Sequence, residues 1–405
     1  MARLAIAPFT GQPYDMALWT YSSRLYFQTG NLDARYFPTL PMIYYFQLAS
    51  YSVYVMLRLV GLGDQVFLFH TSYMVEGFFL KLPIIAADTG VFFILLAYTR
   101  KLSYASLFYL NPFIIYLSSA WGTYDSVMMM FLVAGFYSLN RGKDRTAGAL
   151  FIISGLAKLF GFIPFLFLLI YESRKKHWRD IVAQLGLGAI ASVLLFLPII
   201  FSGGVQGFIS GFVLRFLVAG AGQSGASWSL YSALQRIQAP TPAPIVWAVG
   251  AMTVAGFVVH LIKTHAAVPV ILTWSIIAAV VLNTFTIAEP QWLSWLIPLG
   301  IIYAWAMGRE SLARFAYFFG VVTTLLIMTL TQGTGYVLTG VAIDILGPLE
   351  GFYNGLAVYA ICVTSLMLMF LGFVFIKNAR FRWEILPITI IIYTQAYFWF
   401  VIERL

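Results

Sequence analysis

Long apolar stretches follow one another along nearly the whole chain, and short polar or basic segments separate them. About 20 apolar residues in a helix can cross the hydrocarbon core of a bilayer, because a helix satisfies its backbone hydrogen bonds internally. The pattern predicts helices of this kind at 82–99, 103–119, 124–139, 146–171, 181–201, 243–262, 267–287, 291–307, 312–331, 354–376 and 385–402. We therefore expect an all-α, polytopic membrane protein.

The composition supports this expectation. Of the 405 residues, 61% are hydrophobic and only 10% are charged, and the mean hydropathy is +0.87. A water-soluble globule could not bury so much apolar surface. The single cysteine, Cys362, excludes an intrachain disulfide and a cysteine metal cluster, and the four histidines lack the spacing of a zinc motif.

Basic residues collect in the short segments between the apolar stretches. In a soluble protein a net charge of +9 would suggest nucleic acid or an acidic partner, but this distribution follows the positive-inside rule for cytoplasmic loops. We therefore expect no nucleic-acid binding. The predicted cytoplasmic positions are Arg100-Lys101, Arg141 to Arg145, Arg174 to Arg179, Lys263, Arg309 with Arg314, and Lys377 to Arg382.

With those loops inside, the apolar segments pair into hairpins whose tips lie outside. Trp121 to Asp125 form one tip and Ala288 to Trp292 another, and residues 202–242 form a long external loop. Residues 146–171 have basic flanks but the length of one span. We expect two short helices there, meeting near 155–161 and holding Lys158 in the outer half of the membrane.

The N-terminal part, residues 1–81, is expected outside as a first external loop with interfacial helices, and residues 82–405 as the helical bundle of the same single domain. Residues 38–81 form either a hairpin of two spans or amphipathic helices in the interface, and Glu76, Lys81 and many tyrosines favour the interface. The first eleven residues are too short and too mildly apolar for a signal peptide or a span. An external N-terminal part then requires one further helix before it, which gives about 12–13 spans.

Charged residues on the predicted external side are the candidate functional groups, since a charge at membrane depth is costly unless it is paired or reaches water. Asp15 and Asp125 stand at predicted helix starts, so each is either a helix N-cap or a site carboxylate. Asp88 lies in an apolar helix, where pairing with Lys or Arg competes with catalysis. Lys158 either binds a phosphate or a carboxylate, or extends its ammonium to the membrane surface.

Two external segments supply further candidates. The loop 202–242 is rich in glycine and carries Arg215 and Arg236, so it is either a mobile lid whose arginines bind phosphate or an ordinary flexible loop. Glu289 stands on a hairpin tip, where solvent exposure alone would explain it. Its neighbours Gln291 and Trp292 favour a site.

Several short motifs in one order resemble those of the GT-C class of membrane glycosyltransferases, which use polyprenyl-phosphate-linked sugars. The resemblance covers about residues 12 to 300. It rests on an acidic residue in the first external loop, Asp15, and on Tyr36-Phe37-Pro38-Thr39-Leu40-Pro41, Lys81-Leu82-Pro83 with Asp88, Leu110-Asn111-Pro112-Phe113, Trp121-Gly122-Thr123-Tyr124-Asp125-Ser126, Gly155-Leu156-Ala157-Lys158, and Glu289-Pro290-Gln291-Trp292-Leu293-Ser294-Trp295-Leu296-Ile297-Pro298. The mannosyltransferases of this class look most similar.

The resemblance implies a GT-C-like bundle that transfers a hexose, most simply mannose, with inversion from a polyprenyl or dolichyl phosphate to a glycan, lipid or protein acceptor. It implies Asp15 as general base, and Asp125 as a carboxylate that either orients the acceptor or shares in catalysis. Phosphate and substrate contacts fall to Lys158, Arg215, Arg236, Glu289, Gln291 and Trp292, with Asp88, Trp121 and Tyr124 in supporting positions. The active face would be extracytoplasmic, in a prokaryotic plasma membrane or a eukaryotic endoplasmic reticulum.

Two departures from the class pattern matter. Glu289 stands where the class usually has histidine, which removes one expected contact to the donor phosphate. The first loop lacks a clear Asp-x-Asp pair, so the sequence implies no certain cofactor and leaves a divalent metal open. A transporter or flippase of lipid-linked glycans is the alternative of another class, and a noncatalytic assembly subunit is a third. A transporter commonly has two similar halves and a site near the midplane, whereas here the halves differ and the polar groups gather at one face.

Overall fold

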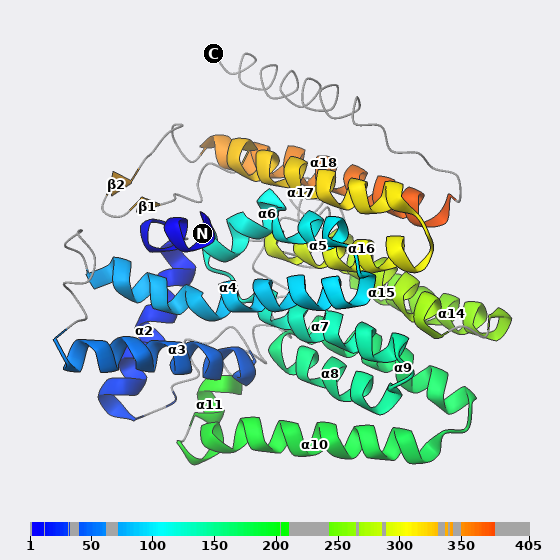
Figure 1. Ribbon diagram of the computed structural model, residues 1–405, viewed down its shortest axis with the longest axis horizontal. Coiled ribbons are helices and arrows are strands. Elements are labelled where there is room, and N and C mark those ends of the chain that lie inside the picture. The colour runs from blue at the N-terminus through cyan, green and yellow to red at the C-terminus, as the bar shows by residue number, and fades with distance from the viewer. Residues whose placement is uncertain are drawn as a thin grey trace.

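The computed structural model describes residues 2–11, 13–30, 32, 40–61, 72–202, 204–209, 243–264, 267–285, 289–330, 337–338, 341–342 and 350–376. The predicted helix at 385–402 lies outside these residues, as does most of the loop 202–242. Figure 1 shows the described long helices running in roughly one direction, with one helix, α2, crossing them near one end.

The described chain is helical apart from one pair of two-residue strands. The helices are α1 Ala2–Ile6, η1 Ala7–Phe9, α2 Pro13–Thr29, α3 Pro41–Leu59, α4 Ser72–Thr99, α5 Leu102–Tyr109, α6 Pro112–Ile115, η3 Tyr116–Trp121, α7 Asp125–Asn140, α8 Asp144–Ala157, η4 Leu159–Gly161, α9 Phe162–Arg174, α10 Trp178–Phe201, α11 Val205–Phe208, α14 Ala243–Lys263, α15 Ala267–Phe285, η6 Pro290–Trp295, α16 Leu296–Ala306, α17 Glu310–Leu330 and α18 Glu350–Phe375. The strands β1 Val337–Leu338 and β2 Val341–Ala342 pair antiparallel.

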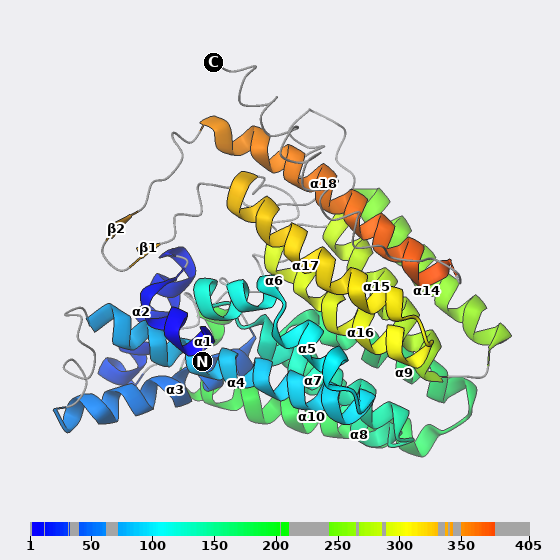
Figure 2. The ribbon, with the colours of Figure 1, turned by 45° about the horizontal axis from the view of Figure 1, so that its top comes forward.

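One continuous apolar core joins these helices, and α7 lies within it. Helix α7 packs against α4 on one side and α8 on another, while α16, α17 and α18 pack in succession. Figure 2 shows α17 and α18 side by side at the outside of the bundle. Apolar residues on several sides of α7 are buried, among them Val127, Met128, Leu132 and Phe136. A helix with so little polar surface is stable only inside a bundle or a membrane.

Other helices turn apolar side chains outward. Within the described ranges, three helical stretches are long and apolar enough to cross a bilayer: Val75–Thr99, Trp178–Phe201 and Glu310–Ile327. Along α10 the exposed large side chains are Val182, Leu185, Leu187, Ile190, Val193, Leu194, Leu197, Ile200 and Phe201. Water-soluble monomers rarely expose so long an apolar face, whereas lipid covers it without cost. The protein is an all-α integral membrane protein.

The predicted break within 146–171 is confirmed. Helix α8 ends at Ala157, Lys158 has extended backbone angles, and α9 begins at Phe162. The break is tightly packed, because a Cβ atom at Gly161 would stand 2.3 Å from the backbone nitrogen of Gly155. Only glycine allows the two short helices to approach this closely.

Two predicted boundaries are wrong. The helix expected over 103–119 is interrupted at Leu110, because Asn111 caps a new helix through its Oδ1 and Pro112 occupies the first helical position. The helix expected to start at residue 82 starts at Ser72 instead. Glu76 and Lys81 do not end it, since both side chains find polar partners inside the protein.

The partners of Glu76 also fix the positions of α2 and α3 relative to α4. Arg24 of α2 donates two hydrogen bonds to Glu76, at 2.9 and 2.5 Å, and Tyr51 of α3 donates a third at 2.8 Å. Charge-assisted, bidentate pairs of this kind fix orientation as well as distance. Helices α2, α3 and α4 are therefore joined at one buried carboxylate.

Candidate active site

Asp125 lies at a meeting point of three segments that are far apart in the sequence. It is the first residue of α7, and its side chain is 1% exposed. Its Oδ1 accepts a hydrogen bond from Trp295 Nε1 at 2.8 Å, and its Oδ2 contacts Lys158 Nζ at 2.7 Å. The start of α7, the break between α8 and α9, and the turn before α16 thus converge on one carboxylate.

These contacts distinguish between the two predicted roles of Asp125, helix N-cap or site carboxylate, and between those of Lys158. Asp125 follows the N-cap residue Tyr124, and no side chain caps this helix, so the N-cap interpretation of Asp125 is wrong. Lys158 has the carboxylate partner that was one of its two predicted ligands, and its side chain remains 19% exposed. An ammonium has three donors, of which Asp125 takes one.

Asp15 lies near Asp125 and is likewise held by a hydrogen bond from a tryptophan. It lies in the first turn of α2, as the third residue and not as the N-cap, and its Oδ2 accepts a hydrogen bond from Trp121 Nε1 at 2.6 Å. Trp121 is buried and packs edge-on against Tyr116 at 6.0 Å. Each of the two predicted catalytic carboxylates is therefore oriented by the N–H of a buried tryptophan.

The electrostatic surroundings of Asp15 make its carboxyl a weaker acid. Burial and the negative charge of Glu289 together raise its pKa from 3.8 to about 6. The hydrogen bond from Trp121 and the positive charge of Lys158 act in the opposite direction, and Asp125 adds a smaller upward contribution. Asp15, Asp125, Lys158 and Glu289 therefore form one coupled group.

The turn that carries Trp121 is fixed by its glycine. Gly122 has a φ of 93°, in the left-handed region, and a Cβ atom there would stand 2.8 Å from Met16 Sδ and 3.1 Å from Lys81 Cε. Both the backbone conformation and the space require glycine. Helix α2, helix α4 and the Trp121 turn consequently pack without a gap beside Asp15.

Lys81 joins the segment before α2 to the Trp121 turn. It was not among the predicted site residues. Its fully buried ammonium donates to the carbonyl oxygens of Ala7, at 3.0 Å, and Thr10, and to those of Ser119, at 2.9 Å, and Ala120, at 3.2 Å. The first segment leads into Asp15 and the second into Trp121. A buried lysine costs free energy unless its donors are satisfied, and here they hold two backbone segments together.

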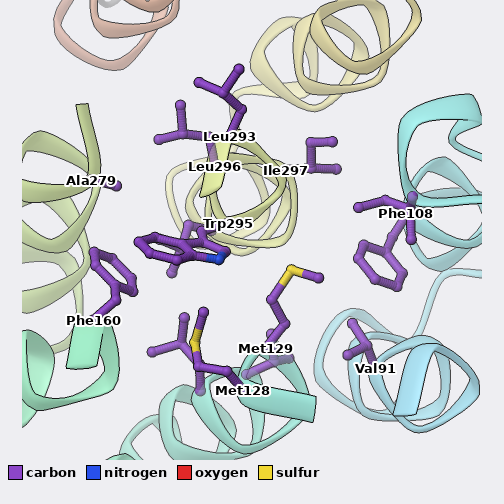
Figure 3. Close-up of a cluster of buried hydrophobic side chains, with 14 of the residues drawn as sticks. Val91, Phe108, Met128, Met129, Phe160, Ala279, Leu293, Trp295, Leu296 and Ile297 are labelled. Atoms are coloured by element: carbon purple, nitrogen blue, oxygen red, sulfur yellow. The ribbon is translucent and has the colours of Figure 1, made fainter. Parts of the chain in front are cut away.

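The second predicted tip carries the remaining candidates. Glu289 accepts a hydrogen bond from Gln291 Nε2, while the buried Gln291 Oε1 has no hydrogen-bond donor within the described part of the chain. Trp292 stacks on Trp295 at 5.3 Å, and Trp295 stacks on Phe160 at 4.6 Å. Figure 3 shows Trp295 and Phe160 packed together in the core near Met128 and Leu296. The stack runs from the partly exposed Trp292 inward to the partner of Asp125.

The supporting residues have structural partners. Asp88 pairs with Arg3 at 2.6 Å, and Arg3 also donates to Ser118 at 2.6 Å, so the expectation that Asp88 has a basic partner is confirmed. Tyr124 donates to the carbonyl of Leu80 at 2.7 Å and packs edge-on against Trp19. These contacts fasten the N-terminal segment and α2 to α4 and α7.

Some candidates cannot be placed, and others were missed. Arg215 and Arg236 lie outside the described residues. Lys81 and Trp295 were missed as site residues, although they stand in the motifs Lys81-Leu82-Pro83 and 289–298. The signals that could have found them are the need of a buried ammonium, and of a buried indole N–H, for a polar partner.

Among the described residues, Asp15, Asp125 and Glu289 do not gather their oxygens closely enough to form a metal-binding group. The group that does so is Glu172, His177 and Asp180, at another place in the fold.

Comparisons with known proteins give only a distant likeness. No protein-family model matches the sequence, and no curated protein matches it. Two solved structures of ArnT from Cupriavidus metallidurans are similar in fold, each with 14% sequence identity. The one bound to undecaprenyl phosphate has a TM-score of 0.48 and matches 91% of this chain and 75% of ArnT. The apo structure has a TM-score of 0.45 and matches 88% and 72%.

Proposed function

We propose that this protein is a GT-C-type membrane glycosyltransferase that moves a hexose from a polyprenyl-phosphate carrier to an acceptor hydroxyl. The observation that carries the proposal is the pair of carboxylates, Asp15 and Asp125, each oriented by an indole N–H and linked by the charge of Lys158. The residues match the order of motifs that resembles the GT-C class.

Asp15 is the general base in this proposal. A base works best when its pKa lies near the working pH, and burial together with Glu289 raises the pKa of Asp15 to about 6. Its carboxylate takes the proton of the acceptor hydroxyl, and the acceptor oxygen forms a bond to the anomeric carbon. The bond from that carbon to the phosphate oxygen breaks, and its electron pair leaves with the polyprenyl phosphate. Attack opposite the leaving group inverts the anomeric centre.

Lys158 supplies positive charge for the departing phosphate. Its contact with Asp125 fixes the ammonium, and Trp295 fixes Asp125 in turn. Such preorganised charge stabilises the transition state without reorganisation during the reaction. Besides three carboxylates, the described site holds the fully buried ammonium of Lys81, whose donors are used by backbone carbonyls, and the partly exposed ammonium of Lys158. We therefore assign the further phosphate contacts to Arg215 and Arg236.

The tip at 289–292 acts on the sugar in this proposal. Glu289 is a poor ligand for a phosphate, because both are negative, and its charge raises the pKa of Asp15 instead. The buried Gln291 Oε1 can accept from a sugar hydroxyl, and the partly exposed face of Trp292 offers an apolar surface for the sugar ring. We assign mannose as the sugar on the resemblance to mannosyltransferases.

The site faces the extracytoplasmic side in this proposal. Asp125 begins α7, Lys158 follows the end of α8, and Trp295 precedes α16. The opposite ends of these three helices adjoin the basic segments at 141–145 and 309–314. By the positive-inside rule those ends are cytoplasmic, which supports a multi-pass topology with the site outside.

The direct test uses the purified protein with a polyprenyl-phosphate mannose or glucose and candidate glycan, lipid and protein acceptors. We expect release of polyprenyl phosphate together with glycosylated acceptor. Movement of the lipid-linked sugar across proteoliposomes without release of polyprenyl phosphate would instead establish the transporter alternative.

Substitution of the base gives the second test. Asp15→Asn keeps the size and the Trp121 contact but cannot take a proton, so transfer should fall by about 10²-fold or more. Size-exclusion chromatography and circular dichroism should match the unsubstituted protein. The control is Glu310→Gln, at an exposed carboxylate near the other end of the bundle. Full activity of Asp15→Asn would remove Asp15 from the mechanism.

A further inference from the structure

A second cluster of ionisable side chains lies where α8, α9 and α10 meet. Asp144 begins α8, Glu172 lies in the last turn of α9, His177 precedes α10, and Asp180 lies in the first turn of α10. Gln184 of α10 donates to the carbonyl of Asp144 at 3.3 Å and helps to hold the junction together. None of these residues takes part in the proposed transfer.

The position of this cluster separates it from the candidate active site. Asp144 and Lys158 stand at the two ends of α8, which has 14 residues. At about 1.5 Å per residue, the cluster lies roughly 20 Å from Lys158 along that helix.

Glu172 is the unusual member of the cluster. Its side chain is fully buried, its Oε2 lies 2.8 Å from His177 Nδ1, and no hydrogen-bond donor among the described residues reaches its Oε1. The carboxylate of Asp144 also approaches Glu172. Two carboxylates in contact repel each other unless a proton or a cation lies between them, and a buried carboxylate oxygen without a partner is costly.

The donor atoms are spaced for a metal ion. One donor atom each from Glu172, His177 and Asp180 lies within 4.8 Å of the others, and His177 Nδ1 is 2.8 Å and 4.0 Å from the two carboxylates. With bonds of about 2.0–2.1 Å, a tetrahedral Zn²⁺ site places its ligands roughly 3.3 Å apart. The two observed distances lie on either side of that value, and the separation of the two carboxylates is at most 4.8 Å, so the His177 and Asp180 side chains must both move toward the ion.

Two basic residues beside the cluster are directed elsewhere, and a third pairs with one oxygen of Asp180. Arg174 donates to carbonyl oxygens at the end of α14, and Lys175 lies over the ring of Tyr171 at 4.3 Å. Arg145 contacts Asp180 Oδ1, which leaves Asp180 Oδ2 facing His177. The His177 side chain is 46% exposed and gives the cluster a path to solvent.

We propose that Glu172, His177 and Asp180, with Asp144 beside them, bind one divalent cation of the Zn²⁺ type on the face opposite the candidate active site. One nitrogen and two or three carboxylate oxygens make a donor set typical of Zn²⁺. The ion would fasten the ends of α8, α9 and α10 to one another. Its binding needs neither a sugar donor nor transfer activity.

The test uses the full-length protein in detergent after removal of metals by a chelator. Co²⁺ is the first probe, because its visible absorption reports coordination, and Zn²⁺ is then added in competition. We expect saturable binding of one ion for each chain, displacement by Zn²⁺, and a rise in the thermal midpoint when metal is present. His177→Ala and Asp180→Asn should each weaken binding at least tenfold and reduce the thermal shift.

One variant serves as the control, and either of two results would contradict the proposal. Glu310→Gln, in the exposed pair with Arg314, should bind metal as the unsubstituted protein does. His177 and Asp180 are partly exposed, so both variants should fold even if Glu172→Gln does not. Absence of saturable Co²⁺ binding, or unchanged affinity in both variants, would overturn the proposal. Transfer activity is not measured, so these results are independent of the proposed glycosyltransferase function.

Discussion

At the scale of single residues, the chemistry depends on how protein groups set the acidity of one carboxyl. Asp15 lies in a half-buried position next to Trp121, and the charges of Glu289 and Lys158 act on it. Burial disfavours the charged form and Glu289 repels it, so the carboxyl keeps its proton to a higher pH than an exposed aspartate would. The residue that departs from the class pattern, Glu289, thereby acquires a role as a determinant of the pKa of Asp15.

The first prediction concerns the pH profile of transfer. Asp15 must be ionised to act as base, and its pKa is raised from 3.8 to about 6, so activity should be low at pH 5 and should rise through pH 6. Glu289→Gln removes a negative charge that raises this pKa, so the acidic limb should move to lower pH. Initial rates of polyprenyl phosphate release between pH 4.5 and 8 would measure the acidic limb of the unsubstituted protein and that of Glu289→Gln. Coincident limbs would show that Glu289 does not act on the base.

At the scale of elements, the site depends on how the N-terminal segment and the Trp121 turn are fastened to α4. Lys81 holds the carbonyls of both segments, and Gly122 allows Met16 and Lys81 to pack against the turn. A misplacement of about 1 Å in such a site can cost on the order of 10²-fold in rate. Substitutions that loosen this contact should therefore impair transfer without touching the substrate.

Lys81→Met should lower kcat by about 10- to 100-fold, because the methionine fills the space but releases both backbone segments. If Trp121 then loses its contact with Asp15, the acidic limb should move to higher pH, since that hydrogen bond lowers the pKa of Asp15. This shift separates a positioning role from a general loss of stability. The control is Lys101→Met, at an exposed lysine just beyond the other end of α4. A normal rate and an unshifted limb in Lys81→Met would contradict the positioning role.

Gly122→Ala should destabilise the protein by about 1–3 kcal/mol, because the residue would adopt a left-handed backbone and its Cβ would meet Met16. Gly142→Ala is the matched control, since Gly142 also has a positive φ, 68°, but no atom within 4 Å of its would-be Cβ. Thermal unfolding followed by fluorescence would compare the two variants. Equal losses of stability would mean that backbone strain alone, and not the packing against α2 and α4, requires glycine at 122.

At the scale of the whole molecule, the two proposed sites lie at opposite ends of α8. The candidate active site gathers the start of α7, the end of α8 and the turn before α16, whereas the cation cluster gathers the start of α8, the end of α9 and the start of α10. The exposed apolar face of α10 lies between these ends and faces lipid. In the proposed topology the two candidate sites therefore face opposite sides of the membrane.

This arrangement makes a topological prediction. In a Cys362→Ser background, a Gln28→Cys variant should react with a membrane-impermeant thiol reagent added from outside intact cells, because α2 is expected to be external. A Lys143→Cys variant, in a basic loop, should react only after the membrane is permeabilised. Both positions are exposed, so protection reports the membrane and not burial. External labelling of Lys143→Cys would reverse the proposed orientation.

The sequence by itself determined the class of protein and most of its helices. Apolar length fixes the spans at 181–201, 243–262 and 267–287 to within a few residues of the observed helices, because bilayer thickness sets helix length. The break at Lys158 was equally visible, since a segment with basic flanks at both ends and the length of one span must turn back. Asp15, Asp125 and Lys158 stood out because charges are rare and costly in such a chain.

Only the tertiary structure decided which of these residues meet. The contacts of Asp125 with Trp295 and of Asp15 with Trp121 join residues 170 and 106 positions apart, and no local pattern encodes such a pairing. The same holds for Asp88 with Arg3, for the carbonyls around Lys81, and for Glu172 with Asp144. Hydrophobic periodicity and charge indicate whether a helix packs against lipid, against another part of the protein or against water. Which partner it receives depends on packing between helices, and packing is a property of the whole fold.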